Sequence, residues 1–158
     1  MDITFKTEEG NFNYRVCAVM IHEDHLLVMR DRRSPYYYLP GGRVELHETA
    51  EDAVLREVRE ELQIDAKIIR PLWLNQGFFV EDVTKERFHE LCLYFLIDIS
   101  GTDLLERGKE FTCMEGKLCL EYEWMGFDQL KEAYLYPIFM KEAVYRLPES
   151  LQLMREYE

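Results

Sequence analysis

The sequence has no long apolar run, no closely paired cysteines and few basic residues for its acidity. No stretch of about eighteen apolar residues occurs, so no transmembrane helix is expected. The residues Met1 to Thr4 lack the basic and then apolar profile of a signal peptide, which predicts a cytoplasmic protein. No Cys-x-x-Cys pair is present, so we expect reduced thiols with structural roles at Cys17, Cys92, Cys113 and Cys119.

Acidic side chains exceed basic ones by 31 to 19, which gives a formal net charge of −12. Nucleic-acid polymers bind proteins largely through Lys and Arg, so we expect no such polymer as a partner. The same negative charge repels a small phosphorylated molecule. A phosphorylated substrate therefore requires divalent cations or a local basic cluster at its site.

The length and apolar content predict one domain over residues 1–158. With 47% hydrophobic and 13% aromatic residues, 158 residues can bury a substantial core. We expect no flexible linker. No membrane association is expected either, and a homodimer is left open.

Apolar runs rich in β-branched and aromatic residues predict strands at Tyr14–Ile21, Leu26–Met29, Lys67–Leu74, Leu91–Ile99 and Leu118–Met125. The polar residues 22–25 would join the first two strands as a hairpin. Residues 82–86 would form a second turn between Phe79 and Phe88. Because short turns join these strands, we expect a sheet with mixed or mostly antiparallel strand pairing.

Helical periodicity is clearest from Thr49 to Leu62, where Ala50, Val54 and Val58 recur every four residues. Thr49 and the acid three residues later resemble a capping box. Two further helices are expected at 128–134 and after Pro137, and the glycine-containing segment 100–116 is expected to be a long surface loop. This order of elements predicts an α/β sandwich.

The most informative stretch runs from Leu39 to Asp65 and reads LPGGRVELHETAEDAVLREVREELQID. At roughly 100° per residue, Glu57, Glu60 and Glu61 fall within an arc of about 100° on the helix. Like charges so close repel one another, and a divalent cation would remove that cost. Carboxylate oxygens are ligands that Mg²⁺ prefers, so these residues predict a metal site.

The simpler alternative is an acidic solvated helix face with ion pairs to Arg56 and Arg59. The preceding turn favours the metal site instead. Gly41 and Gly42 allow close approach of the backbone to a ligand, and Gly42 has a carbonyl that can face a cation.

Taken together, these residues resemble the Nudix box: Gly, five residues, Glu, seven residues, Arg-Glu, an apolar residue, any residue, Glu-Glu, any residue, Gly and an apolar residue. The matching positions are Gly42, Glu48, Arg56, Glu57, Val58, Arg59, Glu60, Glu61, Leu62, Gln63 and Ile64. Gln63 departs from the pattern, because the family has Gly where the chain leaves the helix. If φ is positive there, Gln is less favourable than Gly.

The resemblance implies an α/β (α+β) fold, a Nudix-like α/β/α sandwich with a mixed central sheet and the box as loop, helix and loop. In similar proteins the glutamates hold Mg²⁺ or Mn²⁺, which assigns a metal-binding role to Gly42, Glu57, Glu60 and Glu61. The resemblance also implies catalytic roles for Glu57, Glu60 and Arg56. Glu48 is expected to position the metal ligands without binding the metal itself. The implied reaction is hydrolysis of a diphosphate in a nucleoside diphosphate linked to a moiety X, or in another small diphosphate, by a metal-activated water.

The base that takes the proton from water is left open between a box glutamate and a later acid, for which Glu115, Glu121 and Glu123 are candidates. Ordinary exposed acids are the alternative for each. Candidate substrate contacts are the basic residues Arg30 and Arg32 and the aromatic residues Tyr36, Tyr38 and Phe78, which core packing or a plain hairpin end would equally explain.

Two other functions remain open from the sequence. One is a Nudix-like module that senses a nucleotide without cutting it, although no box carboxylate is lost here. The other is isomerisation of an allylic diphosphate, which would need Cys17 or Cys92 to face the metal. The proline spacing typical of ADP-ribose hydrolases is absent, since Pro71 comes early and the next proline is Pro137, so that subclass is disfavoured.

Overall fold

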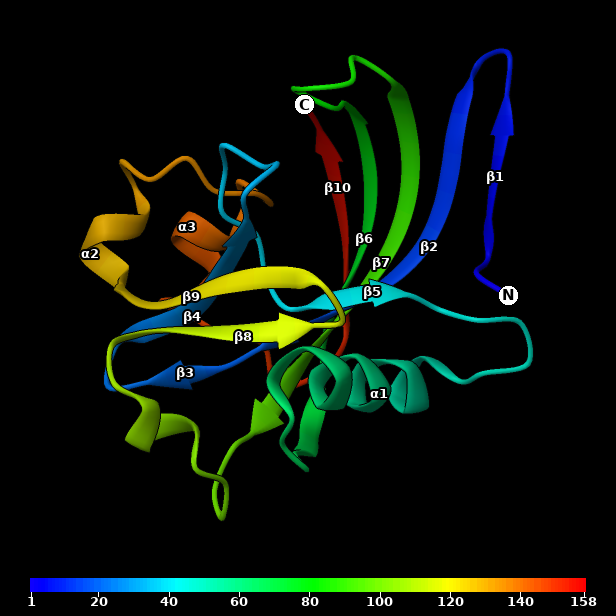
Figure 1. Cartoon of the computed structure of the whole chain (residues 1–158). Coiled ribbons are helices and arrows are strands. Elements are labelled where there is room, and N and C mark those ends of the chain that lie inside the picture. The colour runs from blue at the N-terminus through cyan, green and yellow to red at the C-terminus, as the bar shows by residue number, and fades with distance from the viewer.

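Two β-sheets form the centre of the computed structural model, which describes residues 1–158 (Figure 1). The six-stranded sheet has the order β1 (Thr4–Thr7), β2 (Gly10–Val19), β7 (Arg87–Asp98), β6 (Lys67–Val80) and β10 (Gln152–Tyr157), with β5 (Gly41–Arg43) beside β2. The four-stranded sheet has the order β3 (Ile21–His22), β4 (His25–Asp31), β9 (Leu118–Gly126) and β8 (Glu110–Glu115). β2 and β7 are parallel, as are β6 and β10, and the other pairs are antiparallel. The predicted mixed sheet is therefore confirmed.

Helices lie on both sides of these strands (Figure 1). The long helix is α1 (Ala50–Leu62), and the short ones are η1 (Leu104–Arg107), α2 (Phe127–Leu130) and α3 (Met140–Ala143). None of these helices has the length and apolar character needed to cross a membrane.

Alternate residues of β2 face two different hydrophobic cores. Val16 and Ala18 pack with Val54 and other residues of α1, whereas Cys17 and Val19 belong to the core that contains α2 and α3. Both faces of this central strand are thus buried, which explains its nearly continuous apolar sequence. The two cores give the predicted α/β/α layering, so the fold class is confirmed.

The predicted first hairpin is wrong in part. β2 ends at Val19 and pairs with β7 in the six-stranded sheet, and only the two-residue β3 pairs with β4. The second predicted turn is confirmed, since Phe79 lies opposite Phe88 where β6 and β7 meet.

The helices predicted near the C-terminus are much shorter than expected. The backbone after α2 bonds to Tyr37 instead of continuing the helix, because Tyr37 N donates to Tyr134 O at 2.7 Å and Tyr136 N donates to Tyr37 O at 3.0 Å. The chain then ends in β10, a strand missed by the sequence analysis that pairs with β6.

The segment 100–116 is not one long loop, because it contains η1 and β8, and β8 pairs with β9. The strand pattern of this segment is weak, because exposed polar residues and glycines surround the alternating apolar residues Phe111 and Cys113. These two residues pack against the core that contains α1. The short strand β1 was likewise missed, since only Ile3 and Phe5 mark it as apolar.

Both ends of α1 agree with the sequence signals. Thr49 Oγ1 accepts a hydrogen bond from Asp52 N at 3.1 Å, as the capping pattern predicted. At the other end Gln63 has φ 58° and ψ 42°, the left-handed conformation in which Gly is favoured, and its N–H donates to Arg59 O. The side chain of Gln63 also donates from Nε2 to Met114 O at 3.2 Å.

Replacing Gln63 with Gly is expected to stabilise the protein by about 1 kcal/mol, because Gly adopts positive φ without the Cβ penalty. For a domain of this size the melting temperature should rise by about 2–4 °C in thermal denaturation. Gln63→Ala keeps the Cβ and loses the side-chain bond, so it should be no more stable than the wild type. A Gly variant that melts below the wild type would contradict this explanation.

Candidate active site

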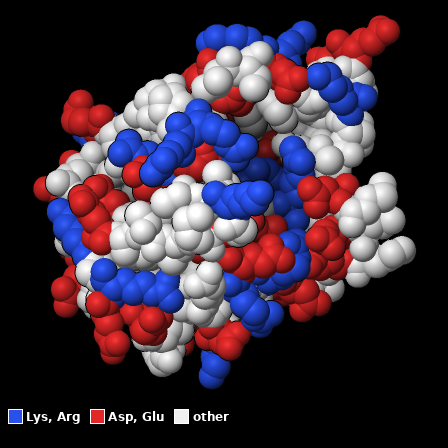
Figure 2. All heavy atoms as spheres, viewed as in Figure 1, with Lys and Arg blue, Asp and Glu red and all other residues white.

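A cavity of about 650 Å³ lies on the face of the six-stranded sheet opposite α1 and reaches the end of that helix. Its walls include β5, the C-terminal turn of α1, the segment after β4 and the turn between β6 and β7. In Figure 2 blue Lys and Arg atoms gather around a hollow near the centre of the visible face, with red Asp and Glu atoms on its flanks. The cavity therefore combines both charges within an acidic protein.

The glycine of the predicted box lies directly against a box glutamate. A Cβ added to Gly42 would overlap the carboxylate of Glu57, so only glycine permits this contact. Next to it, Gly41 N donates to Glu61 Oε1 at 3.1 Å. The glycine turn and the last turns of α1 are thus joined through two carboxylates, and both carboxylates line the cavity.

Glu57 and Glu61 share a buried position that disfavours two negative charges. Glu61 is only 4% exposed, and burial, followed by the charge of Glu57, raises its pKa well above the usual range. Burial also raises the pKa of Glu57, although Arg56 opposes the shift. Without a cation, burial and mutual repulsion therefore disfavour ionisation of both groups at once.

Arg56 organises the remaining acids of the box. Its Nε donates to Glu48 Oε2 at 2.7 Å and its Nη2 to Glu48 Oε1 at 3.0 Å. Nη1 donates to Glu57 Oε1 at 2.9 Å and to Glu60 Oε2 at 3.3 Å. Arg56, through these bonds, lowers the pKa of Glu48 and keeps that carboxylate ionised.

The three predicted metal ligands are only partly brought together. Glu57 and Glu61 meet in the cavity, whereas Glu60 is 49% exposed and bonds to Arg56. No group of three or more His, Cys, Asp or Glu side chains is arranged to hold a metal ion. The residues present nevertheless fit a hard cation, because the buried carboxylate of Glu61 and the largely buried carboxylate of Glu57 both line the cavity, and Glu57 occupies the space left by the missing Cβ of Gly42.

Two arginines that the sequence analysis missed lie beside these acids. Arg15 on β2 and Arg43 on β5 are cross-strand partners, and both line the cavity. The side chain of Arg15 is 29% exposed, and its Nε lies 4.0 Å from Glu90 Oε2, which also accepts a bond from Asn13 Nδ2 at 3.4 Å. The available sequence signal was a lone arginine inside an otherwise apolar strand.

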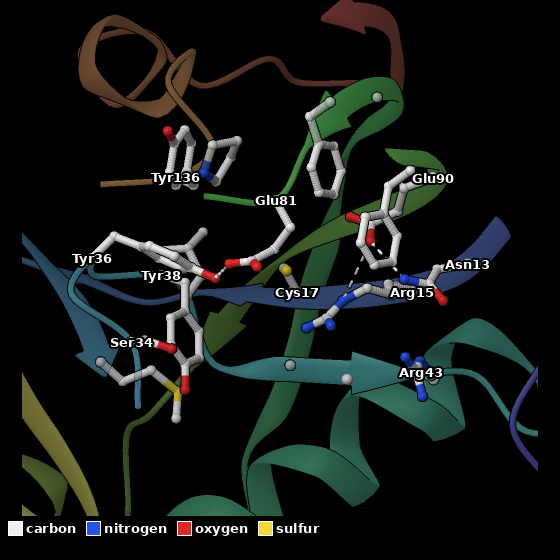
Figure 3. Close-up of a pocket in the computed structure, with 18 of the residues that line it drawn as sticks. Asn13, Arg15, Cys17, Ser34, Tyr36, Tyr38, Arg43, Glu81, Glu90 and Tyr136 are labelled. Carbon is white, nitrogen blue, oxygen red and sulfur yellow. Dashed lines mark hydrogen bonds and ion pairs between the residues drawn. The ribbon is translucent and has the colours of Figure 1, made fainter. Parts of the chain in front are cut away.

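Arg15 keeps its charge despite its position. Burial alone would lower its pKa, but the carboxylate of Glu90 and other acidic groups nearby raise it overall. Figure 3 shows Arg15, Asn13 and Glu90 together on one side of the cavity. A charged guanidinium at this depth is suited to bind a phosphate group.

Of the three later acids, only Glu115 lines the cavity, where its charge contributes to the raised pKa of Glu61. Glu121 instead pairs with Arg30 at 3.1 Å on the four-stranded sheet. Glu123 lies near Glu110, and burial raises its pKa. The alternation of β9 therefore separates the last two from the cavity.

Only some of the predicted substrate-binding residues line the cavity. Tyr36 and Tyr38 line the cavity, but Arg30 and Arg32 do not. Arg30 is occupied by Glu121 and lies over the ring of Tyr37, whereas Arg33 reaches the cavity while paired with Asp31 at 3.4 Å.

Phe78 points to the opposite face of the sheet, against Tyr157 and His89. Its neighbour Phe79 lines the cavity in its place, because successive strand residues face opposite ways.

The amino-acid sequence is also similar to that of known proteins. A family model described as NUDIX domain matches residues 11–147. The chain is 29% identical over 92 residues to the ADP-ribose pyrophosphatase of Methanocaldococcus jannaschii, covering 56% of this chain and 52% of that protein. It is 30% identical over 118 residues to the NAD-capped RNA hydrolase NudC of Pectobacterium atrosepticum, covering 74% of this chain and 39% of that protein. The chain thus spans about half or less of the length of these relatives.

Solved structures show the same fold. An ADP-ribose pyrophosphatase from Streptococcus suis superposes with a TM-score of 0.57 at 17% identity, covering 92% of this chain and 98% of that one. A MutT protein from Bacillus halodurans gives a TM-score of 0.59 at 16% identity, covering 92% and 89% of the two chains. At such low identities the likeness concerns the fold alone.

The contact between Gly42 and Glu57 can be tested by Gly42→Ala. The added methyl group meets the flexible end of Glu57, so the fold should persist while the carboxylate is displaced. We expect Mn²⁺ affinity, measured by electron paramagnetic resonance titration, to fall by about tenfold or more. Unchanged Mn²⁺ binding in the folded variant would show that this contact does not define a metal site.

Proposed function

Because this chain belongs to the NUDIX domain family, we propose that it hydrolyses the diphosphate linkage of a nucleoside diphosphate joined to a moiety X, with Mg²⁺ or Mn²⁺ as cofactor. One observation supports this above the others. The carboxylates of Glu57 and Glu61 share a cavity with the guanidinium groups of Arg15 and Arg43. The acidity of the chain requires a cation or a basic cluster at a phosphate site, and this cavity has side chains suited to provide both.

Glu57, Glu61 and the carbonyl of Gly42 are the groups that would hold the metal, with Glu60 joining them from the exposed side of α1. When bound, such a cation activates a water molecule and neutralises charge on the leaving phosphate. A metal ion would require both glutamates in their ionised form, whereas burial alone raises the pKa of each. Arg56 favours this ionisation through its bond to Glu57.

The side chains of the protein contribute positioning and charge. Arg15 and Arg43 would orient the phosphate oxygens from the sheet side, and the rings of Tyr36 and Tyr38 flank the opposite wall. Burial raises the pKa of Tyr38 and so keeps its hydroxyl protonated as a hydrogen-bond donor. Glu115 is the later acid placed to accept a proton from water, beside the box glutamates themselves.

Neither alternative function is favoured by a specific contact. A module that only senses nucleotides would have no need of all the box carboxylates, and every one is present. For an isomerase, Cys17 does line the cavity, but its Sγ lies 3.6 Å from that of Cys92 inside the sheet. Burial raises the pKa of Cys92 well above the usual range, which suits a structural thiol.

The proposal is tested first with Glu57→Gln, which removes one negative charge and preserves the side-chain volume. Metal-dependent release of nucleotide should fall by at least about 100-fold. A panel of nucleoside triphosphates, nucleotide sugars, ADP-ribose and NAD, with products identified by mass spectrometry, supplies the substrates. Arg59→Gln on the same helix, whose partner is the exposed Asp65, should retain activity. Undiminished turnover by Glu57→Gln would remove this residue from the mechanism.

The role of the missed arginine is tested with Arg15→Gln together with Glu90→Gln, which avoids an unpaired buried acid. Loss of the phosphate contact should lower kcat/KM by about tenfold or more, mainly through KM. Arg32→Gln is the matched control, because Arg32 does not line the cavity. Equal kinetics for both variants would exclude a phosphate contact at Arg15.

A further inference from the structure

The floor of the cavity is one face of four neighbouring strands. The register of these strands aligns their residues in rows of cross-strand neighbours. In one row Arg15 on β2 lies beside Cys92 on β7, followed by Asn75 on β6 and Met154 on β10. The next row runs through Asn13, Glu90, Gly77 and Glu156. Three strand spacings, or about 14 Å, separate the β2 side from the β10 side.

The two sides of this floor differ in their basic residues. Arg15 and Arg43 are on the β2 and β5 side, next to the box glutamates. The β10 side and the adjoining turn present only acids to the cavity: Glu81, Asp82, Glu156 and Glu158. Figure 3 shows the same separation, with Arg15 and Asn13 on one side and Glu81 with Tyr36 and Tyr136 on the other.

Glu156 and Glu158 form an acid pair that no basic side chain neutralises. Glu156 Oε2 accepts a bond from Phe139 N at 2.9 Å, and Glu158 Oε1 accepts one from Ile138 N at 3.5 Å. Neither carboxylate has a salt bridge, and neither do Glu81 and Asp82. Although Glu158 is an exposed residue, partial desolvation and then the neighbouring Glu156 raise its pKa to about 8, as expected for two carboxylates that repel each other. A cation at this position would relieve that repulsion.

Aromatic rings stand beside these acids. Tyr36 and Tyr136 line the cavity with ring centroids 5.3 Å apart and planes at 79°. Their hydroxyl groups bind carboxylates, since the Tyr36 hydroxyl donates to Glu81 at 2.8 Å and the Tyr136 hydroxyl donates to Asp82 at 2.8 Å. Hydrogen bonding to carboxylates increases the electron density of a ring, which favours a cation against its face.

A separate observation on the floor also points to a ligand. Asn75 is 5% exposed and lines the cavity, and its Oδ1 has no hydrogen-bond partner. Next to it on the same face, Gly77 lies between Glu90 and Glu156, and a Cβ there would be in ordinary van der Waals contact with the side chain of Asn75 at 3.7 Å. A buried acceptor without a partner in the cavity wall is available to a donor on a bound molecule.

From this geometry we infer that the β10 side of the cavity binds a cationic group, so that the moiety X of the substrate carries an ammonium. The inference rests on the proposed function for the diphosphate at the opposite side. An ammonium with N–H donors suits the groups on this wall, which are carboxylates without salt bridges, tyrosine rings and an amide oxygen without a partner. A neutral sugar would leave the carboxylate charges uncompensated, and an anionic group would be repelled.

The test compares two ligands that differ in charge at one end: cytidine diphosphate ethanolamine and its neutral carbon isostere, the cytidine diphosphate ester of 1-propanol. Both carry a methylene group in place of the bridging oxygen of the diphosphate, so they bind the wild-type protein without hydrolysis, and binding is measured by calorimetry with Mn²⁺. The cationic ligand should bind about tenfold or more tightly than the neutral one. Equal affinities, tighter binding of the neutral ligand, or no binding of either would overturn the inference.

Variants then locate the preference. Adding Glu156→Gln and Glu158→Gln should abolish the difference between the two ligands, because glutamine keeps the hydrogen bonds and removes the charge. Glu132→Gln with Glu149→Gln changes net charge equally at exposed positions outside the cavity and should preserve the difference. Gly77→Ala adds a methyl group to the cavity floor in ordinary contact with Asn75, so it should weaken the cationic ligand while the melting temperature stays unchanged. A preference that survives the Glu156 and Glu158 changes would overturn the assignment.

Hydrolysis by the wild-type protein separates the two proposals. If the cationic ligand binds preferentially but no nucleotide is cut with any metal, the proposed hydrolysis fails and the cation site stands. If nucleotides are cut with no preference for the cationic ligand in binding, the hydrolase stands and the cation site fails.

Discussion

The position of α1 against β5 depends on the guanidinium of Arg56. It bonds to both carboxylate oxygens of Glu48, to Glu57 and to the carbonyl of Arg43, so one cation joins the helix to the turn that precedes it. Charge-assisted bonds of this kind contribute about 1.5–3 kcal/mol each. Glu57 and Glu61 lie one helical turn apart on α1, and Arg56, itself outside the cavity, fixes that part of the helix against the end of β5.

Local features of the sequence predicted this part of the molecule well. Thr49 caps the helix, the apolar repeat of Ala50, Val54 and Val58 is buried, and Gln63 has the positive φ expected where the family pattern has Gly. Each feature depends on residues within one or two helical turns, so spacing alone was sufficient. The same logic predicted the turn between Phe79 and Phe88, whose strands are neighbours in sequence.

Contacts between distant segments were not predictable in this way. β10 pairs with β6 about 80 residues earlier, and no local pattern in either strand specifies that neighbour. Strand alternation had a similar effect on single residues, since a one-residue shift separates Phe79 in the cavity from Phe78 on the opposite face. Arg15 and Asn75 looked like interruptions of apolar strands, and only the register of four strands shows that they share a row of the cavity floor.

The formal charge of −12 describes this cavity poorly. Charges separated by more than a Debye length, about 8 Å at physiological salt, are largely screened through water, whereas partly buried groups act strongly at short range. Arg15 therefore dominates the electrostatic potential close to it despite the acidic surface. About three strands away, Glu156 and Glu158 dominate the potential close to them. With a metal ion at the box glutamates, the Arg15 side would attract a negative group and the Glu156 side a positive group, and at this separation the two sides would act nearly independently. Under the two proposals, a ligand with a negative group at one end and a positive group at the other would be stabilised by both sides, and a ligand with only one charged end by one.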